Sequence, residues 1–407
     1  MTDLPQGWRE VALNHVVSVS KETGIPSEKP EYPFVGMEHV ASQTGEIVEY
    51  GNSADYKSGA VIADDALVLY GRLRPYLNKV FIPKSKCFAS GEFIPLRVGP
   101  DLDKRYLLHL LRSANFVTFA VSLNAGDRPR VKWEQMGNFP LALPPLAEQE
   151  RIVEILEEQF SRLDSALASV KAVREKTKAF RRSLLRSLTS EATHFAEPSN
   201  VAKVALSEVG KWGGGGTPSK ANKSFWNAGD IPWVTSKDMK QSVLEDSEMH
   251  ITDEAVKGSS TRLVPANSVA IVARSGILEH TLPVALVPFP STYNQDLKVV
   301  TPLTNVSPKW LLYSLQANGQ EILDSCRKAG TTVASIEFPL FLRYEILLPS
   351  LTEQNRLVGI IEEQFSRLDK ALEVANQLEA RIASERRSLL HSAFTGALTA
   401  TWRQNND

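Results

Sequence analysis

Basic and amide side chains gather in short loops that follow β-like stretches of this sequence. In the first part of the chain these loops are Gly71-Arg-Leu-Arg-Pro75 and Gly126-Asp-Arg-Pro-Arg-Val-Lys132. Further along lie Arg274-Ser-Gly276, Tyr293-Asn-Gln295 and Arg327-Lys-Ala-Gly-Thr-Thr332. Arginine, asparagine and glutamine can form bidentate hydrogen bonds with guanine or adenine edges, while lysine, serine and threonine suit phosphates. One such loop alone is more commonly a polar surface turn, but their recurrence in both halves favours contact with DNA.

The predicted DNA contacts are basic or polar side chains of these loops and of their neighbours. In the first half of the chain they are Arg72, Arg74, Lys79, Arg128, Arg130 and Lys132. In the second half they are Thr217, Ser219, Lys237, Arg274, Ser275, Tyr293, Asn294, Gln295, Lys328, Thr331 and Thr332.

The sequence lacks the spacing that catalytic, cofactor and metal sites require. The glycines of Gly213–Lys220 are not followed by the Lys-Ser/Thr step of a phosphate-binding loop, which favours a turn. Neither a GxGxxG motif nor an Asn/Asp-Pro-Pro-aromatic tetrapeptide is present. The seven histidines are scattered, and Asp64-Asp65 is typical of a solvated turn before a strand. We therefore expect no catalytic, cofactor-binding or metal-binding residue in this chain.

The overall charge argues mildly against nucleic acid. The 46 Lys and Arg residues face 47 Asp and Glu residues, so the net charge is −1. Any DNA affinity must then come from local patches or from a partner protein. A chain of 407 residues suits two or three domains. Because it has no long apolar run, no leader pattern and only two separated cysteines, we expect a reduced, cytoplasmic protein.

A repeated segment must position these loops. Residues 143–188 recur at 348–393 with a constant offset of 205, and 24 of the 46 aligned positions are identical. Counted in heptads from Gln149, both copies have mostly apolar a and d rows, which is typical of a coiled coil. About 42 helical residues span roughly 60 Å, and the two copies can pair antiparallel. The predicted seam residues are Leu156, Leu163, Val170, Leu184, Ile361, Leu368, Ile382 and Leu389.

Other apolar residues of the repeat form a second stripe beside these two rows. In the first copy they are Ile155, Phe160, Leu167 and Leu185. The stripe can pack on the chain's own globular parts or provide a docking face for a partner protein, and the pattern leaves both alternatives open.

Each copy of the helix follows a globular segment, which predicts two matched halves. The expected domains are 1–142, 143–196, 197–347 and 348–407. The β-like runs are 66–70, 79–82 and 93–98 in the first half, and 268–272, 284–287 and 297–300 in the second. They precede predicted helices at 104–122 and 308–326, and Arg72 matches Arg274 at an offset of 202. We predict an α+β fold in which two similar globular domains are joined by two long antiparallel coiled-coil helices with pseudo-two-fold symmetry.

Several further motifs resemble one known family. Both helices open with Leu-Ala/Thr-Glu-Gln, at 146–149 and 351–354, and the chain ends with Phe394-Thr-Gly-Ala-Leu-Thr-Ala-Thr-Trp-Arg403. The other motifs are Leu4-Pro-Gln-Gly-Trp8, Gly216-Thr-Pro-Ser219, Trp226, Gly229-Asp-Ile-Pro-Trp233 and Asp238. Together they resemble the specificity subunit of type I restriction-modification enzymes. One departure is that the terminal motifs have no clear counterpart at the junction near residues 191–200.

The resemblance implies a non-catalytic targeting subunit. Its globular halves would be target recognition domains, each reading one part of a split, asymmetric DNA site, while the helices set the gap of several base pairs. Two modification subunits would dock on the chain to form an adenine methyltransferase, and restriction subunits would add translocation and cleavage. S-adenosylmethionine, ATP and magnesium are then expected in the partner subunits. The alternatives are a coiled-coil scaffold that binds only proteins and, less compatible with the missing motifs, a self-sufficient methyltransferase.

Overall fold

A computed structural model of the chain describes residues 4–124, 126–190, 201–328 and 332–406. The chain folds into two compact units, each with its own internal contacts. Unit 1 comprises Met1–Lys171 with Asn376–Asp407, and unit 2 comprises Ala172–Ala375. Each long helix therefore contributes one half to each unit. The predicted domain boundary at residue 196 and the junction near 191–200 lie outside the described residues.

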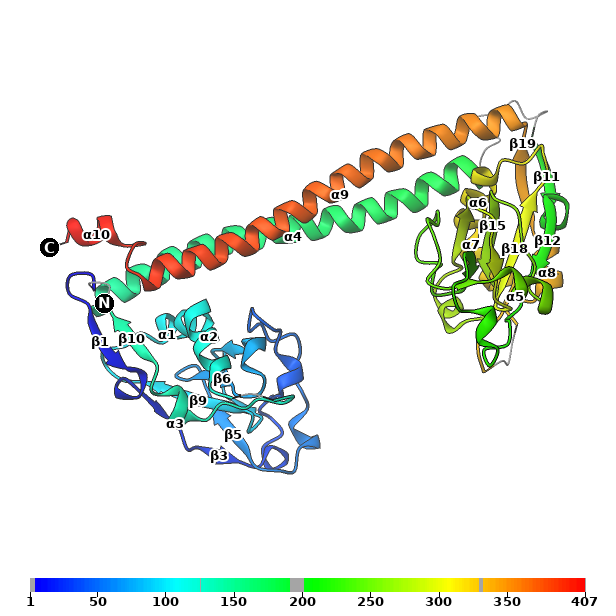
Figure 1. Ribbon diagram of the computed structural model, residues 1–407. Helices are drawn as coiled ribbons and strands as arrows, with labels where there is room; N and C mark the ends of the chain where they lie inside the picture. Colours follow the sequence, from blue (N-terminus) through cyan, green and yellow to red (C-terminus); the bar gives the residue numbers. More distant parts are fainter. Residues whose placement is uncertain (1–3, 125, 191–200, 329–331, 407) are drawn as a thin grey trace. The chain divides into compact units, whose positions relative to one another are not determined.

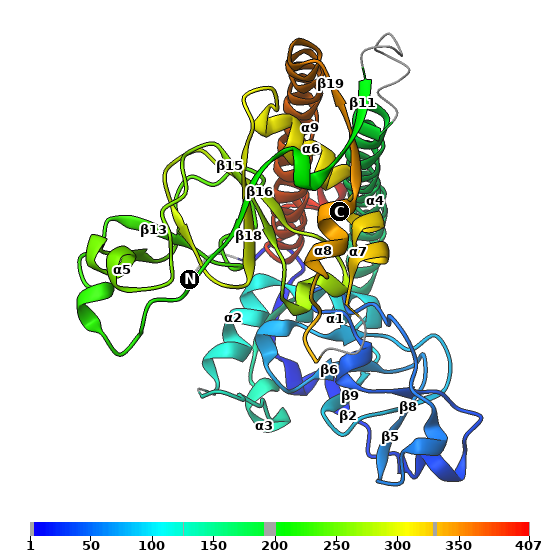
Figure 2. The same ribbon diagram turned by 90° about the vertical axis from the view of Figure 1, so that its right-hand side faces the viewer.

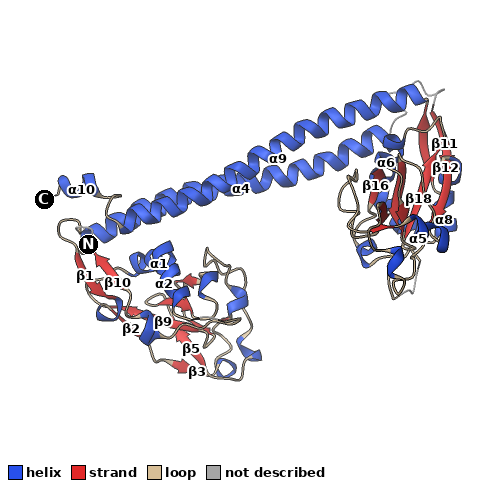
Figure 3. Ribbon diagram, in the orientation of Figure 1, coloured by secondary structure: helices blue, strands red, loops and turns tan. Residues whose placement is uncertain are grey.

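Each unit is built on a four-stranded antiparallel sheet of the same topology (Figures 1 and 3). In unit 1 the order is β2 (Val17–Val19), β9 (Phe93–Val98), β6 (Val68–Gly71) and β7 (Val80–Phe81). In unit 2 it is β12 (Gly210–Gly214), β18 (Leu297–Pro302), β15 (Ser268–Val272) and β16 (Val284–Val287). The registers agree as well, because Val68 pairs with Leu96 where Val269 pairs with Val300. The β-like runs of the sequence thus become the central sheets.

A second sheet differs between the units. In unit 1 its order is β3 (Thr23–Gly24), β5 (Ala60–Ala63), β8 (Cys87–Ala89) and β4 (Phe34–Val35). In unit 2 it is β14 (His250–Ile251), β13 (Ile231–Val234) and β17 (Thr292–Tyr293). Both contain one parallel pair, β4 with β8 and β13 with β17. The shared fold therefore diverges mainly at this sheet.

Short strand pairs lead from each globular part into its long helix. In unit 1, β1 (Arg9–Ala12) pairs with β10 (Pro140–Leu143); in unit 2, β11 (Val201–Ala205) pairs with β19 (Glu345–Pro349). The helices α4 (Leu146–Ser190) and α9 (Leu351–Phe394) begin within three residues of β10 and β19. Residues at the start of the repeat are thereby fixed to the sheet region of their own unit.

The predicted helices at 104–122 and 308–326 are each broken in two. Unit 1 has α1 (Lys104–Arg112) and α2 (Ala114–Ser122), and unit 2 has α6 (Pro308–Ala317) and α7 (Gly319–Cys326). The break in unit 1 lies at Ser113, which has an extended backbone and whose hydroxyl accepts the Phe116 N–H as an N-cap. Shorter helices follow as α3 (Trp133–Met136) and α8 (Phe338–Arg343), while α5 (Asp253–Gly258) lies beside β13 of the second sheet of unit 2 (Figure 2).

Helix α1 in unit 1 and helix α6 in unit 2 each pack between the central sheet and the long helices (Figure 2). In unit 1 the ring of His109, in α1, lies 5.6 Å from that of Phe160, in α4. In unit 2 the ring of Tyr313, in α6, lies 5.9 Å from that of Phe365, in α9. Phe160 and Phe365 are the same position of the repeat, so the sheet–helix–long-helix layering is equivalent in the two units.

The long helices run antiparallel, as predicted. In unit 1, Arg386 of α9 pairs with Asp164 of α4, and in unit 2 Arg181 of α4 pairs with Asp369 of α9. These two ion pairs exchange places under the offset of 205. Each arginine also lies over the repeat phenylalanine, Arg386 on Phe160 and Arg181 on Phe365, at 4.9 and 4.6 Å. The duplicated sequence therefore makes duplicated contacts between the helices.

The predicted seam is buried or half-buried along its a row, whereas its d row is buried near the starts of the helices, at Ile152 and Leu357, and exposed further along. Of the a-row residues, Val170, Ile361 and Ile382 are buried, as is Leu156, while Leu163, Leu184, Leu368 and Leu389 are half-buried. The d row is exposed at Val173 (42%) and Phe180 (50%). The row four residues after each a position is buried at Val153 and Leu188 and half-buried at Phe160, Leu167 and Arg181. Since both rows carry apolar residues at heptad spacing, the sequence alone does not separate them.

Candidate nucleic-acid interface

The two basic loops predicted in unit 1 lie side by side. Leu73 and Arg130 form an antiparallel bridge between them. The Arg74 N–H donates to the Pro129 carbonyl at 2.8 Å, and the Val131 N–H donates to the Arg72 carbonyl at 2.9 Å. The loop after β6 and the loop at 126–132 are therefore one platform, which we name the unit 1 platform (residues 71–75 and 128–132).

A carboxylate lies within this platform. Arg130 donates from Nε and Nη2 to both carboxylate oxygens of Glu92, at 3.0–3.2 Å. Hydrogen bonding to Glu92 raises the pKa of Arg130. Arg72 approaches the same carboxylate at 3.9 Å. Arg74 has a left-handed backbone, with φ of +52°, and is the N-cap residue of the short helical turn Pro75–Leu77.

Unit 2 builds an equivalent platform from residues 273–276 and 334–336. Arg274 forms a bridge with Ser335, the Ser275 N–H donates to the Ala334 carbonyl at 3.0 Å, and the Ile336 N–H donates to the Ala273 carbonyl at 2.8 Å. Arg274 pairs with Asp296 at 2.7 Å. This pattern aligns Arg274 with Leu73 at an offset of 201. The expected match of Arg274 with Arg72 is wrong, because sequence counting cannot fix the register of the loops.

Several predicted contacts lie outside the platforms. The Lys79 ammonium donates to the Met37 carbonyl at 2.6 Å, and partial burial lowers its pKa. Tyr293 is 1% exposed and Asn294 is 8% exposed, so the structure places both of these predicted contacts in the interior of the unit. Burial raises the pKa of Tyr293 to about 12. Thr331 lies outside the described residues.

The remaining predicted contacts are on the surface. Thr217 donates to Gln295, linking the glycine-rich loop to the segment after β17. The other exposed side chains are Arg128, Lys132, Ser219, Lys237, Lys328 and Thr332, while Ser275 is half-buried and caps the turn after Arg274. The loops of each unit thus present basic and polar groups of different kinds.

Sequence reasoning missed Glu92 and Asp296. Each carboxylate lies directly before the central strand of its sheet, β9 or β18. A signal was available, since the two acids are 204 residues apart, close to the offset of the repeat. Only basic and polar side chains were predicted from the sequence as DNA contacts.

The motifs that resemble the family in unit 2 hold loops in place. The Trp233 indole donates to the Gly216 carbonyl at 3.0 Å and packs edge-on against Trp226 at 5.0 Å. A Cβ at Gly216 would lie 2.5 Å from the Ser260 hydroxyl oxygen and 2.7 Å from the Thr261 nitrogen. Glycine is needed for this close approach. The predicted turn at Gly213–Lys220 is right only from Gly215 on, because Gly213 and Gly214 belong to strand β12 and pair with β18.

The N- and C-terminal segments lie near the start of α4 in unit 1 (Figure 1), and their motifs meet there around a buried carboxylate. Glu148 is 1% exposed. It accepts hydrogen bonds from the Trp8 indole at 2.9 Å and the Thr399 hydroxyl at 2.6 Å, and it pairs with Arg403 of α10 (Ala400–Gln404). The repeat counterpart, Glu353, instead pairs with Arg356 one turn away. Both terminal motifs therefore serve one site, which explains why they lack counterparts elsewhere in the described sequence.

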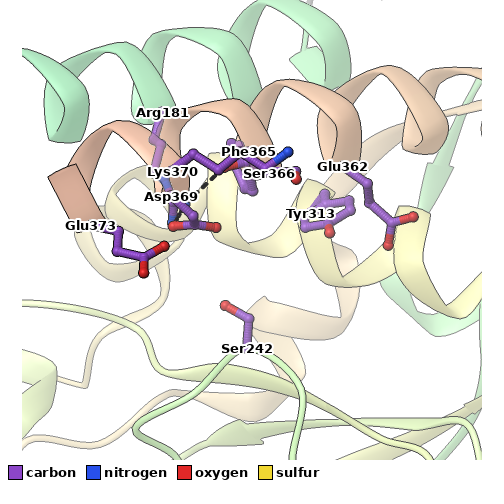
Figure 4. Close-up of a pocket in the computed structure, with 9 residues that line it drawn as sticks. All are labelled: Arg181, Ser242, Tyr313, Glu362, Phe365, Ser366, Asp369, Lys370 and Glu373. Atoms are coloured by element: carbon purple, nitrogen blue, oxygen red, sulfur yellow. Dashed lines mark hydrogen bonds and ion pairs between the residues drawn. The ribbon is translucent and has the colours of Figure 1, made fainter.

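A pocket of about 520 Å³ lies beside the long helices in unit 2 (Figure 4). Tyr313 of α6 and Arg181 of α4 line it together with one face of α9. Burial and Glu362 raise the pKa of Tyr313 to about 12, which does not suit acid–base chemistry near neutral pH. In the part of the chain that the structure describes, no cluster of acids, histidines and cysteines could hold a metal ion. No helix there is long and apolar enough to span a bilayer.

Comparison with known proteins places this fold and its loops in one class. The family model of the type I restriction modification DNA specificity domain matches residues 5–169 and again residues 198–383. The chain therefore belongs to this family, as the sequence motifs predict. The double match also agrees with the two equivalent units.

Individual relatives agree with this assignment. The chain is 41% identical over 218 residues to the EcoR124I/EcoR124II specificity subunit of Escherichia coli, which covers 54% of this chain and 52% of that relative. This match spans about half the length of the relative. The EcoKI specificity subunit of Escherichia coli K12 is 23% identical over 440 residues, covering 99% and 92% of the two chains.

Solved structures share the fold. A chain from a study of complex assembly and conformational transition of the type I R-M system has a TM-score of 0.78 at 20% identity, covering 97% of this chain and 99% of that one. The HsdS subunit from Thermoanaerobacter tengcongensis has a TM-score of 0.56 at 20% identity, with 97% and 98% covered. The predicted α+β fold, with duplicated domains and two long helices, is thereby confirmed.

Proposed function

We propose that this chain is the DNA-specificity subunit of a type I restriction-modification assembly in the cytoplasm. Each unit would read one part of a bipartite DNA site, and the long helices would set the unread gap between the parts. The observation that carries the proposal is the occurrence of one loop platform in both units with different side chains on it. The equivalent platforms support the recognition of one half-site by each unit. Because the side chains on the two platforms differ, we predict that the two half-sites have different sequences.

The chain itself would supply no chemistry. Two modification subunits would contribute the S-adenosylmethionine site and the methyl transfer to adenine, and restriction subunits would contribute ATP- and magnesium-dependent cleavage. Exposed apolar side chains on the long helix, such as Val173 and Phe180, support docking of a partner on this surface. Partner subunits that enclose the DNA would also compensate for the net charge of −1.

A domain exchange tests the proposal. The chain would be co-expressed with its modification subunit, and methylated adenines would be mapped across the genome by sequencing. Replacing residues 1–142 with the corresponding segment of a family member should change one half-site and leave the other half-site and the gap intact. A change in both half-sites, or in neither, would contradict independent reading by the two units.

The scaffold function remains the second candidate, because the chain is slightly acidic and exposes apolar helix residues. Mobility-shift assays distinguish the scaffold function from the specificity function. They would compare binding of the complex to duplexes with and without the mapped site at a series of salt concentrations. A specificity subunit should discriminate between the duplexes and lose affinity steeply with salt, because phosphate contacts release counterions. Equal, salt-insensitive binding to both duplexes would favour the scaffold.

A further inference from the structure

Glu92 and Asp296 occupy the same place in their units. The Glu92 carbonyl accepts the Arg72 N–H at 2.9 Å, and the Asp296 carbonyl accepts the Ala273 N–H at 2.8 Å. Each residue immediately precedes the central strand that pairs with the platform strand. The backbone therefore presents both carboxylates at equivalent positions beside the two platforms.

The arginine that binds each carboxylate comes from a different loop. In unit 1 it is Arg130, whose cross-strand partner is Leu73; in unit 2 it is Arg274, whose cross-strand partner is Ser335. Leu73 corresponds to Arg274, and Arg130 corresponds to Ser335. The arginine has thus changed strands between the units while the carboxylate has kept its place. The two units thus place a guanidinium beside the equivalent carboxylate although the arginine comes from different strands. This indicates that a cation at that position has a function.

Stability alone is a weak reason for such a pair. The side chains of Arg130 and Arg274 are 48% and 58% exposed, and those of Glu92 and Asp296 are 29% and 24% exposed. Exposed ion pairs contribute little to folding because water screens them. Within the described residues, each carboxylate binds Nε and Nη2 of its arginine. Nη1 and one Nη2 hydrogen are then left to donate to a ligand.

We propose that Glu92 and Asp296 are equivalent positioning residues, which hold Arg130 and Arg274 for bidentate hydrogen bonding to a guanine in the half-site of their own unit. This inference rests on the proposed function and adds the base contact within it. An arginine fixed at Nε has fewer rotamers to lose on binding, and its planar end matches guanine O6 and N7. The carboxylate also repels phosphates, so it penalises DNA that lacks the guanine.

Because the carboxylate is negatively charged, its removal should lower base discrimination and at the same time raise the affinity for non-specific DNA. The complex of this chain with its modification subunit would be assayed for methyl transfer on the mapped site and on every single-base-pair variant of it. Glu92→Gln should reduce discrimination at one base pair roughly tenfold. It should at the same time increase affinity for DNA without the site, because a negative charge is removed. Asp296→Asn should do the same in the other half-site, and Glu92→Asp should retain discrimination.

A transplant within unit 2 tests the change of strand. Arg274→Leu alone should lose discrimination at one base pair. Adding Ser335→Arg recreates the arrangement of unit 1 and should recover part of that discrimination, whereas Ser335→Lys, which lacks the guanidinium fork, should not. Melting temperatures of all variants would exclude a general loss of folding as the cause.

Three results distinguish the ideas. If the unchanged complex methylates no bipartite site, the proposed function fails. If it does, but Glu92→Gln and Asp296→Asn leave every base-pair preference unchanged, the positioning role is overturned. Weaker binding to all DNA in proportion, with no effect confined to one base pair, would also overturn it, because that pattern belongs to a purely structural pair.

Discussion

Glu148 and Glu353 show how one residue of a repeat can take on two energetic roles. Glu148 is buried among the two chain ends, whereas Glu353 forms a partly exposed pair with Arg356, which lowers its pKa by hydrogen bonding. A buried carboxylate that loses its cation is left desolvated without compensation, while an exposed one is rehydrated. The two positions therefore provide a matched comparison within one molecule.

We expect Arg403→Ala to lower the free energy of unfolding by on the order of 3 kcal/mol, because it leaves the buried Glu148 carboxylate without its cation. The matched variant Arg356→Ala should cost less than about 1 kcal/mol, because its pair is partly exposed. Urea titration of the full chain measures both. Equal losses would show that the terminal site is no more buried in solution than the pair at Glu353.

His109 predicts a pH dependence of stability. Burial, with Arg112 and Arg105 nearby, lowers its pKa to about 3. Its ring nitrogens have no hydrogen-bond partner among the described residues. The unfolded chain takes up the proton near pH 6.5 and the folded chain only near 3, so stability falls as pH falls through this window. The loss approaches about 1.4 kcal/mol per pH unit and reaches about 2 kcal/mol at pH 5.

His109→Phe, which keeps an aromatic ring against Phe160, should remove this contribution. The difference in unfolding free energy between pH 8 and pH 5 should then shrink by about 2 kcal/mol. Thermal melts of both proteins at the two pH values measure it. An unchanged difference would mean that the imidazole is protonated or hydrated in the folded state.

At the scale of elements, one glutamine fastens each long helix to its own globular part. Gln149 donates to the carbonyls of Asp101 and Pro144 at 2.9 and 2.8 Å and accepts the Asp103 N–H at 2.9 Å. Gln354 makes the same three bonds, to Asn305, Pro349 and Ser307, at 3.1, 2.8 and 2.8 Å. Both side chains are fully buried. The recurring Glu-Gln opening is thus a structural clamp.

We expect Gln354→Glu to destabilise unit 2 by roughly 3 kcal/mol, because a carboxylate would face two carbonyls in a buried site. Hydrogen exchange should accelerate in β11 and β19 but remain unchanged in β1 and β10. Gln149→Glu should give the mirror-image pattern. If either variant accelerates exchange equally in all four strands, the clamps do not act within their own units.

The sequence predicts elements better than it predicts their faces. Alternation and helical period located the central strands and both long helices, because these patterns are local. The exposed d row at Val173 and Phe180 was missed, because the partner helix chooses between two apolar rows. The break at Ser113 follows from a hydroxyl that caps a new helix, and the loop register that pairs Arg274 with Ser335 depends on contacts between distant segments. The exposed helix face and the loop register depend on tertiary contacts, which residue spacing does not encode, whereas the Ser113 cap is a local signal that the helical period does not show.

At the scale of the whole molecule, duplication governs both folding and recognition. The central sheets, the glutamine clamps and the interhelix ion pairs are the same in the two units, while the second sheet and the platform side chains differ. The shared features hold the antiparallel helices in place, whereas the divergent features present polar side chains on the surface. This division lets one half change its loops without disturbing the framework that both halves use.

The interhelix pairs test this independence. Arg386 and Arg181 each bind an aspartate, 62% exposed in both cases, and stack on a phenylalanine. Arg386→Asp and Arg181→Asp should each lower the free energy of unfolding by about 1–2 kcal/mol, through lost attraction, new repulsion and lost stacking. Because the pairs lie in different units and share no partner, the losses should add within about 0.5 kcal/mol in the double variant. Asp164→Arg should restore the charge pair in Arg386→Asp but not in Arg181→Asp. Denaturant unfolding of the unchanged protein and of these five variants decides the question, and cross-rescue or strong non-additivity would show that the two sets of contacts act as one.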